Sequence, residues 1–326
     1  MEAPEALLAQ LHALETSLAV ARLDGVGLLR VIGPDRVEAL HRVVSQDIRG
    51  LAVGDGKLAL LLAPKGQFQA LMAVFAAEDA TYLLAPAGKG EALATGLAKY
   101  LRFSRSRIEP VAVAGAAAVL GPRWGEFAAS LTEEPTLLAQ GGWGRGRDGE
   151  TLWFGQTLLG VPGAVVFSAD TADVDAVIKR LAAAGAEAVS DAAVELERVR
   201  LGWPVWGAEL TETVLPPEVG LEKLAISYTK GCYVGQETIA RLATYGHPNR
   251  QLVGVRETGE ATHPPELPAP LAAQGDERPR ETLTSWAHHP RLGGLGIALA
   301  RRGHATPGTT LTAGPRRFEV ATFPLW

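Results

Sequence analysis

The only cysteine of this 326-residue chain stands in an unusual stretch, Lys230-Gly231-Cys232-Tyr233-Val234-Gly235-Gln236-Glu237. Residues 238–244 follow with apolar side chains at helical spacing, which predicts a short helix that begins near Gln236. Because Gly235 turns freely, we expect Cys232 to lie close to the positive end of that helix. The helix end and the cation of Lys230 both favour a thiolate, so the pattern predicts a thiol with a lowered pKa. The alternative is a small apolar residue that fills a gap in a glycine turn.

Several common kinds of site are not found in the sequence. Gly88-Lys89-Gly90 lacks the spacing and the hydroxyl of a phosphate-binding P-loop. A single cysteine excludes a zinc site built on a cysteine pair, and the seven histidines show no H-x-x-x-H spacing, so we predict no metal site. We interpret the adjacent His288 and His289 as surface residues. A papain-like Cys/His enzyme stays open as an alternative, with His247 the nearest histidine in the sequence.

A chain of 326 residues is too long for one ordinary core, so we predict two or three domains. Its composition, 47% hydrophobic and 21% charged residues, indicates a globular protein. No apolar run reaches the roughly 18 residues of a membrane helix. The first residues lack the basic segment of a secretory signal, and a lone cysteine fits a reducing compartment, so we predict a cytoplasmic protein with no membrane partner.

The charge of the chain is uneven. The net charge is −5, yet residues 240–326 carry ten arginines against seven acidic residues. This excess would suit an anionic partner such as RNA or a polyglutamate tail. Because the excess is small, we interpret these arginines as a solvated surface and do not expect direct RNA binding.

The periodicity of the chain predicts an α+β fold. Two successive units show the order strand, helix, strand, strand, helix, which is typical of helices layered on mixed sheets. We place them at residues 1–110 and 111–245, the second carrying the cysteine motif. Short strands between Gly, Thr and Pro turns predict a small all-β domain at 246–326. Within the first two units, the pattern predicts helices at 4–22 and 171–184 and a strand at 111–120.

The cysteine stretch resembles the K-G-C-[YF]-x-G-Q-E signature of the YgfZ family, relatives of the glycine-cleavage T-protein. Residues 198–207 resemble the family's R-[IL]-x-x-G-x-P-x-x-G, and residues 215–221 its P-x-E-x-G-L. Weaker similarity is found at 44–48 and 62–67. The likeness covers most of residues 25–245 and is strongest over 195–245.

This resemblance implies a T-protein-like fold with tetrahydrofolate or a derivative in a central cavity. It also implies a role in the assembly or repair of iron–sulfur clusters that sustains tRNA-modifying iron–sulfur enzymes, with those enzymes or assembly proteins as partners.

The resemblance also implies which residues do the work. The implied working group is the thiol of Cys232, activated by Lys230. It lies on a loop that Gly231 and Gly235 shape and Glu237 anchors. The motif also includes Tyr233 and Gln236. The residues implied to hold the cofactor are Arg198 as the cation, Trp203, Trp206 and Tyr233 as aromatic walls, and Asp47. The alternative for the aromatic residues is that they fill the core.

Two departures from the T-protein pattern bear on activity. The T-protein aspartate that handles the aminomethyl group has no counterpart in residues 65–70, where Gln69 stands. Aminomethyl transfer needs a charged group to steady the iminium and move protons, so we do not expect this activity. In residues 158–165, Val165 replaces the pterin-binding glutamate, so folate binding would need other residues. The rivals are therefore a non-catalytic adaptor without folate, an aminomethyltransferase, and a cysteine-dependent hydrolase or transferase.

Overall fold

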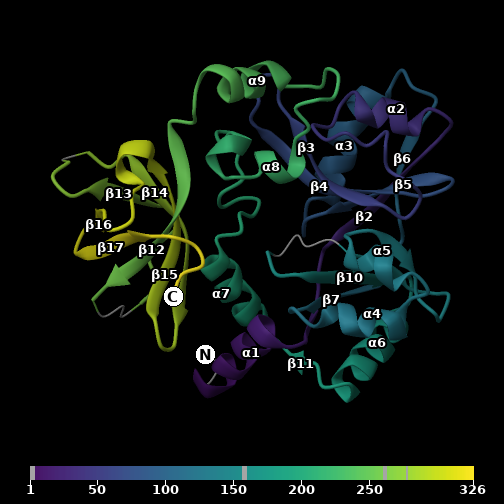
Figure 1. Cartoon of the computed structure of the whole chain (residues 1–326), viewed down its shortest axis with the longest axis horizontal. Coiled ribbons are helices and arrows are strands. Elements are labelled where there is room, and N and C mark those ends of the chain that lie inside the picture. Colours follow the sequence, from purple (N-terminus) through teal and green to yellow (C-terminus); the bar gives the residue numbers. More distant parts are fainter. Residues whose placement is uncertain (1–3, 156–159, 260–262, 277) are drawn as a thin grey trace.

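The computed structural model of the chain describes residues 4–155, 160–259, 263–276 and 278–326. Within these ranges the chain forms three β-sheets with helices packed on them (Figure 1). The helices are α1 (Pro4–Thr16), α2 (Arg36–His41), α3 (Gly90–Leu101), α4 (Trp124–Leu131), α5 (Pro135–Ala139), α6 (Thr171–Ala183), α7 (Asp191–Leu201), α8 (Glu222–Ala225) and α9 (Gln236–Tyr245), with 3-10 turns at Pro216–Glu218 and Arg302–His304.

The first sheet is antiparallel, with strand order β3-β4-β5-β2-β6. Its strands are β2 (Gly27–Ile32), β3 (Gly56–Leu62), β4 (Phe68–Ala76), β5 (Ala80–Ala85) and β6 (Arg107–Pro110). Alternate residues of a strand point to opposite faces of the sheet, and here both faces are buried. Leu58 and Leu60 face the centre of the molecule, whereas Ala59 and Leu61 pack under α2 and α3.

The second sheet has the order β11-β1-β7-β10-β9-β8, with β1 and β11 parallel. Its strands are β1 (Ala19–Arg22), β7 (Gly115–Leu120), β8 (Trp143–Arg145), β9 (Leu152–Phe154), β10 (Gly163–Ser168) and β11 (Glu187–Ala188). Helix α6 covers one face, and it begins where Asp170 accepts a hydrogen bond from the main-chain N–H of Ala172 at 2.9 Å, as an N-cap does.

Two predicted elements are longer than those in the structure. The helix predicted at 4–22 ends at Thr16, and β1 then pairs with β7 in the second sheet. The first 22 residues therefore do not belong with the first sheet, where we had placed them. The strand predicted at 111–120 begins later, at Gly115, as β7 of the second sheet; residues 111–114 lead there from β6, which ends in the first sheet at Pro110. An apolar run does not show where a chain crosses from one sheet to another.

The third sheet is a closed barrel with the order β12-β15-β14-β13-β16-β17. Its strands are β12 (Arg250–Thr258), β13 (Ala269–Ala273), β14 (Glu281–His289), β15 (Gly293–Arg301), β16 (Thr310–Ala313) and β17 (Arg316–Ala321). Its interior is apolar, with Leu271, Leu283 and Phe318 fully buried. Helix α7 lies between this barrel and α1 (Figure 1). The prediction of a small β domain after residue 245 agrees with this barrel.

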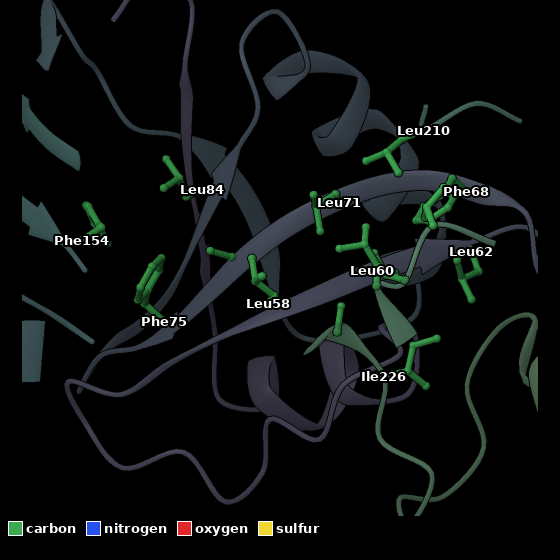
Figure 2. Packing of buried hydrophobic residues seen from close by; sticks show 14 of the residues in the cluster. Leu58, Leu60, Leu62, Phe68, Leu71, Phe75, Leu84, Phe154, Leu210 and Ile226 are labelled. Carbon is green, nitrogen blue, oxygen red and sulfur yellow. The ribbon is translucent and has the colours of Figure 1, made fainter. Parts of the chain in front are cut away.

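The largest apolar core joins the first two sheets and the segment that carries the cysteine motif. Figure 2 shows Leu60 and Phe68 of the first sheet beside Leu210 and Ile226, with Phe154 of the second sheet at the other end of the cluster. Residues 210–239 therefore pack on the first sheet, although they follow the second unit in sequence. This packing brings the motif to the junction of the units.

Candidate functional site

The cysteine lies on a turn that leads into α9, as the sequence predicted. We call residues 230–235 the thiol loop. Cys232 is exposed, and Gly235, the residue before the helix, has φ of 81°. That conformation is strained for a residue with a side chain. The space is also closed there, because a Cβ on Gly235 would press on the carbonyl oxygen of Ala63 and lie 3.0 Å from the Leu62 side chain. The loop thus rests directly on the end of β3.

Replacing Gly235 by alanine should therefore destabilise the protein and displace the thiol loop. We expect Gly235→Ala to lower the free energy of unfolding by roughly 2–3 kcal/mol, from backbone strain and the contact with Ala63. Gly231→Ala is the matched control, because a Cβ at Gly231 meets nothing within 4 Å and should change little. Urea unfolding measures both. Equal effects of the two substitutions would contradict this account of the loop.

Lys230 is directed away from the solvent, and its ammonium is held by main-chain carbonyls. It is 7% exposed, and Nζ donates to the carbonyl oxygens of His41 and Val44 at 2.5 Å and of Gln46 at 3.2 Å. These carbonyls belong to the C-terminal end of α2 and the turn after it, where helical acceptors lack intrahelical partners. The expectation that Lys230 activates the neighbouring thiol is thus corrected: its hydrogen bonds fasten the thiol loop to residues 41–46.

Ser45 completes this attachment. It is fully buried, its hydroxyl donates to the carbonyl of Ala225 at 2.6 Å, and the same hydroxyl accepts the N–H of Leu60 at 2.9 Å. The main-chain N–H of Ser227 donates to the Ser45 carbonyl at 3.0 Å. Strand β3, the turn after α2 and the segment before the thiol loop are therefore joined through one residue.

The charges around Lys230 shift several pKa values. Burial lowers the pKa of Lys230 to about 8, while the carboxylate of Asp47 acts in the opposite direction. Burial and the nearby Lys230 cation lower the pKa of His41, whose Nδ1 is 3.4 Å from an Asp47 carboxylate oxygen. Asp47, which we expected to hold a cofactor, thus lies beside the Lys230 attachment.

The other motif residues have distinct places. Tyr233 is buried in the central core with the Lys230 ammonium 5.3 Å from its ring centre, and burial raises its pKa to about 12. It fills the core, which was the alternative to an aromatic wall. Gln236 opens α9 by donating its main-chain N–H to the Tyr233 carbonyl at 3.3 Å. Glu237 is exposed and makes no hydrogen bond or ion pair within the described ranges, so it is not the anchor we expected.

A cavity of about 230 Å³ opens between the first sheet and the segment after α7; we call it the α3 cavity. A shallower hollow of about 510 Å³ continues it along α3 as far as Lys99. The Lys89 ammonium lies 5.4 Å from the centre of the Trp206 ring, a cation–π arrangement. The lining of the α3 cavity is Gln69, Ala70, Leu71, Pro86, Lys89, Ala92, Leu93, Trp206 and Glu212.

Two residues of this cavity bear on the predictions. Trp206 lines it, where we expected an aromatic wall for a flat ligand. Gln69 lines it too, so the residue in place of the T-protein aspartate faces this cavity. Trp203, the other predicted wall, does not line it; it packs against the central core and lies over Gly160.

Arg198 does not supply the expected cation, because its own side chain is fully engaged. The guanidinium is 4% exposed. Its Nε and Nη2 donate to the Glu195 carboxylate at 2.7 and 2.6 Å. Nη1 donates to the Trp203 carbonyl at 2.6 Å and to the Glu209 carboxylate at 3.3 Å. Nη2 also donates to the Ser285 hydroxyl at 2.7 Å. These contacts use all five N–H groups of an arginine. Arg198 therefore joins α7, the following segment and the barrel, which is a correction to its predicted role.

Val165 lies in β10, and its side chain belongs to the central core. Leu158 and Leu159, from the same predicted stretch, lie outside the described residues.

The α3 cavity contains a carboxylate and a cation that the sequence analysis did not assign to a site. These are the side chains of Glu212 and Lys89. Lys89 had a signal in the sequence: it stands between two glycines just before a helix. Glu212 had none, because its place depends on how residues 202–215 cross the first sheet.

Across the residues that the structure describes, no group of three or more His, Cys, Asp or Glu side chains could hold a metal ion. The described helices likewise include none that is long and apolar enough to cross a membrane.

No protein-family model matches the chain. The chain is 27% identical over 320 residues to a putative chloroplastic transferase of Arabidopsis thaliana, covering 93% of this chain and 70% of that protein. It is 28% identical over 334 residues to an aminomethyltransferase of Saccharopolyspora erythraea, covering 98% and 89%. It is 26% identical over 271 residues to the tRNA-modifying protein YgfZ of Yersinia pestis, covering 82% and 79%.

Among solved structures, the chain is similar to the glycine cleavage system aminomethyltransferase T from Bartonella henselae. The TM-score is 0.82 at 18% sequence identity, with 98% of this chain and 89% of that chain covered. At this identity the likeness concerns the fold alone. The α+β prediction is confirmed: the chain has the glycine-cleavage T-protein fold, with mixed sheets and a closed C-terminal barrel.

Proposed function

We propose that this protein is a YgfZ-type accessory factor that binds tetrahydrofolate in the α3 cavity and supports iron–sulfur enzymes that modify tRNA. The observation that carries the proposal is the make-up of that cavity. It joins an aromatic wall, Trp206, to a cation, Lys89, and a carboxylate, Glu212, while Gln69 stands in place of the T-protein aspartate. The relatives named YgfZ give the link to tRNA modification.

The cavity suits the parts of a folate. A pterin is flat and packs on an indole ring, and its N–H edge pairs with a carboxylate such as that of Glu212. The glutamate end is anionic, and Lys89 and Lys99 provide cations along α3. Binding sites of this kind combine an apolar wall with a few placed polar groups. The Val165 side chain in the core does not argue against this binding, since Glu212 provides a carboxylate in the lining of the cavity.

The working group in this proposal is the Cys232 thiol, which the fold exposes on a rigidly attached loop. We expect Cys232→Ser to reduce tRNA modification at least about tenfold in a bacterial strain that lacks its own YgfZ and carries this protein instead, because a hydroxyl is a poor nucleophile and metal ligand. The exposed position predicts a free energy of unfolding within about 0.5 kcal/mol of the wild type. Gly231→Ala is the control in the same loop. Full support by Cys232→Ser would exclude the thiol as the working group.

The second candidate is an aminomethyltransferase, which the Saccharopolyspora relative and the Glu212 carboxylate favour. The two are separated by an assay with a lipoyl-bound aminomethyl carrier and tetrahydrofolate. The accessory factor gives no turnover, since Gln69 neither carries a charge nor moves protons. Turnover that is abolished by Glu212→Gln would establish the transferase instead, with Glu212 in the role of the missing aspartate.

A further inference from the structure

A second cavity, of about 330 Å³, lies where α1, α7, the β14–β15 hairpin and the C-terminal residues meet; we call it the α1 cavity. Figure 1 shows α1 and the C-terminus on a different side of the molecule from α3. The lining is Leu8, Leu11, His12, Glu15, Arg200, His289, Arg291, Leu292 and Trp326. None of these residues has a part in the function proposed above.

Arg200 brings an unpaired donor to this cavity. Its side chain is 5% exposed, and Nε and Nη2 bind the buried Glu197 carboxylate, each at 2.7 Å. Nε also lies 3.2 Å from Glu15. The third nitrogen, Nη1, is buried and has no hydrogen-bond partner in the described part of the chain. A buried donor in this state is rare in folded proteins.

His289 brings a second donor. We had expected a surface residue, but it is 8% exposed. Its Nδ1 accepts the main-chain N–H groups of Arg291 and Leu292, each at 3.1 Å, because the hairpin turns back over the ring. A nitrogen that accepts two hydrogen bonds carries no proton, so the proton resides on Nε2. The Nε2 atom makes no hydrogen bond within the described ranges, and unlike Arg200 Nη1 it is not fully buried.

Trp326 provides an aromatic wall. Its ring centre lies 4.2 Å from the Arg200 guanidinium carbon, and the ring is 58% exposed. The ring is held there by the preceding residue: Leu325 is fully buried, and its N–H donates to the Arg200 carbonyl at 2.9 Å. Leu8, Leu11 and Leu292 add apolar surface. The lining of the cavity therefore combines polar side chains with apolar and aromatic ones.

We propose that the α1 cavity is a second binding site and takes an aromatic monocarboxylate. The unpaired polar atoms, Arg200 Nη1 and His289 Nε2, are both donors, so the ligand must present acceptors. A planar carboxylate matches a guanidinium and receives further charge from the exposed Arg291. The Glu15 carboxylate beside them disfavours a dianion such as phosphate. An aromatic body then packs on Trp326 and the leucines.

Isothermal titration calorimetry of the full chain with indole-3-acetate tests this site. We expect saturable binding with a Kd of about 1 mM or below, and binding at least about tenfold weaker for the neutral indole-3-acetamide. Trp326→Ala and Arg291→Ala are the variants of choice, because both side chains are exposed, whereas loss of Arg200 would leave buried Glu197 unpaired. Each should weaken binding about fivefold or more, and the surface variant Arg107→Ala, in β6 of the first sheet, should not.

No binding up to about 10 mM indole-3-acetate would overturn the proposal. Equal affinity for the acid and the amide would do the same, since the unpaired donors would then have no role. The proposal would also be overturned if neither Trp326→Ala nor Arg291→Ala weakened binding, because the ligand would then lie outside the α1 cavity.

Discussion

Arg198→Met should be among the most destabilising single substitutions in this protein, with a loss of about 3–5 kcal/mol in the free energy of unfolding. The side chain of Glu209 is fully buried, and it accepts from Arg198 at 3.3 Å and from Ser285 at 2.7 Å. Without the guanidinium, Glu209 is left as a buried charge with no counterion. The substitution also removes the donor of the Trp203 carbonyl, so the contact between α7, the following segment and the barrel is weakened.

Two further variants sharpen this test. Arg123→Ala is the matched control, because the Arg123–Glu126 pair is exposed and should contribute under about 1 kcal/mol. The double variant Arg198→Met/Glu209→Gln removes both charges and should be more stable than Arg198→Met alone. Denaturant unfolding of these proteins measures the coupling. A stable Arg198→Met protein with a lost affinity for folate would instead show that Arg198 binds the ligand.

Lys230→Met should lower the free energy of unfolding by roughly 3 kcal/mol and increase the mobility of the thiol loop. The methionine keeps the apolar stem but leaves the carbonyls of His41 and Val44 without the donor that now lies 2.5 Å from each. A buried acceptor without a partner costs about 1–3 kcal/mol. Lys65→Met is the control, since Lys65 is exposed in the turn before β4 and should change stability by under about 0.5 kcal/mol. Equal stability of the two variants would contradict the fastening role.

The same lysine should make stability depend on pH in a defined direction. Its pKa is about 8 in the folded protein and near 10.5 in the unfolded chain. Between these values the unfolded chain binds more protons than the folded one, so the free energy of unfolding rises with pH across this window. We expect this slope in the wild type and a smaller one in Lys230→Met. Identical slopes would show that Lys230 ionises normally in the fold.

Local features of the sequence predicted much of the structure. The α9 helix, the turn at Gly235, the α6 helix and the C-terminal β domain each depend on residues close together in the chain, and the structure contains all of them. The resemblance to T-proteins predicted the overall architecture, since it covers features of several domains at once.

The contacts that define the site could not be predicted in this way, because they join distant segments. Lys230 finds its acceptors at His41 and Val44, 189 and 186 residues earlier in the chain. Nothing near Lys230 distinguishes an ammonium that activates a thiol from one that binds carbonyls. Arg198 likewise seemed available for a ligand, because its partner Ser285 belongs to a strand of the barrel. Pairings of this kind depend on topology, which the periodicity of single elements does not determine.

The most direct test of the central claim is a tryptophan-fluorescence titration with tetrahydrofolate. We expect saturable quenching at micromolar ligand, a smaller amplitude in Trp206→Phe, and affinity at least about tenfold weaker in Lys89→Ala, because these residues form the aromatic wall and the cation of the α3 cavity. Trp124→Phe, a tryptophan of α4 outside this cavity, is the control for the other indoles and should leave both quantities almost unchanged. No saturable change up to millimolar ligand would contradict the account and favour an adaptor that has the fold without the folate.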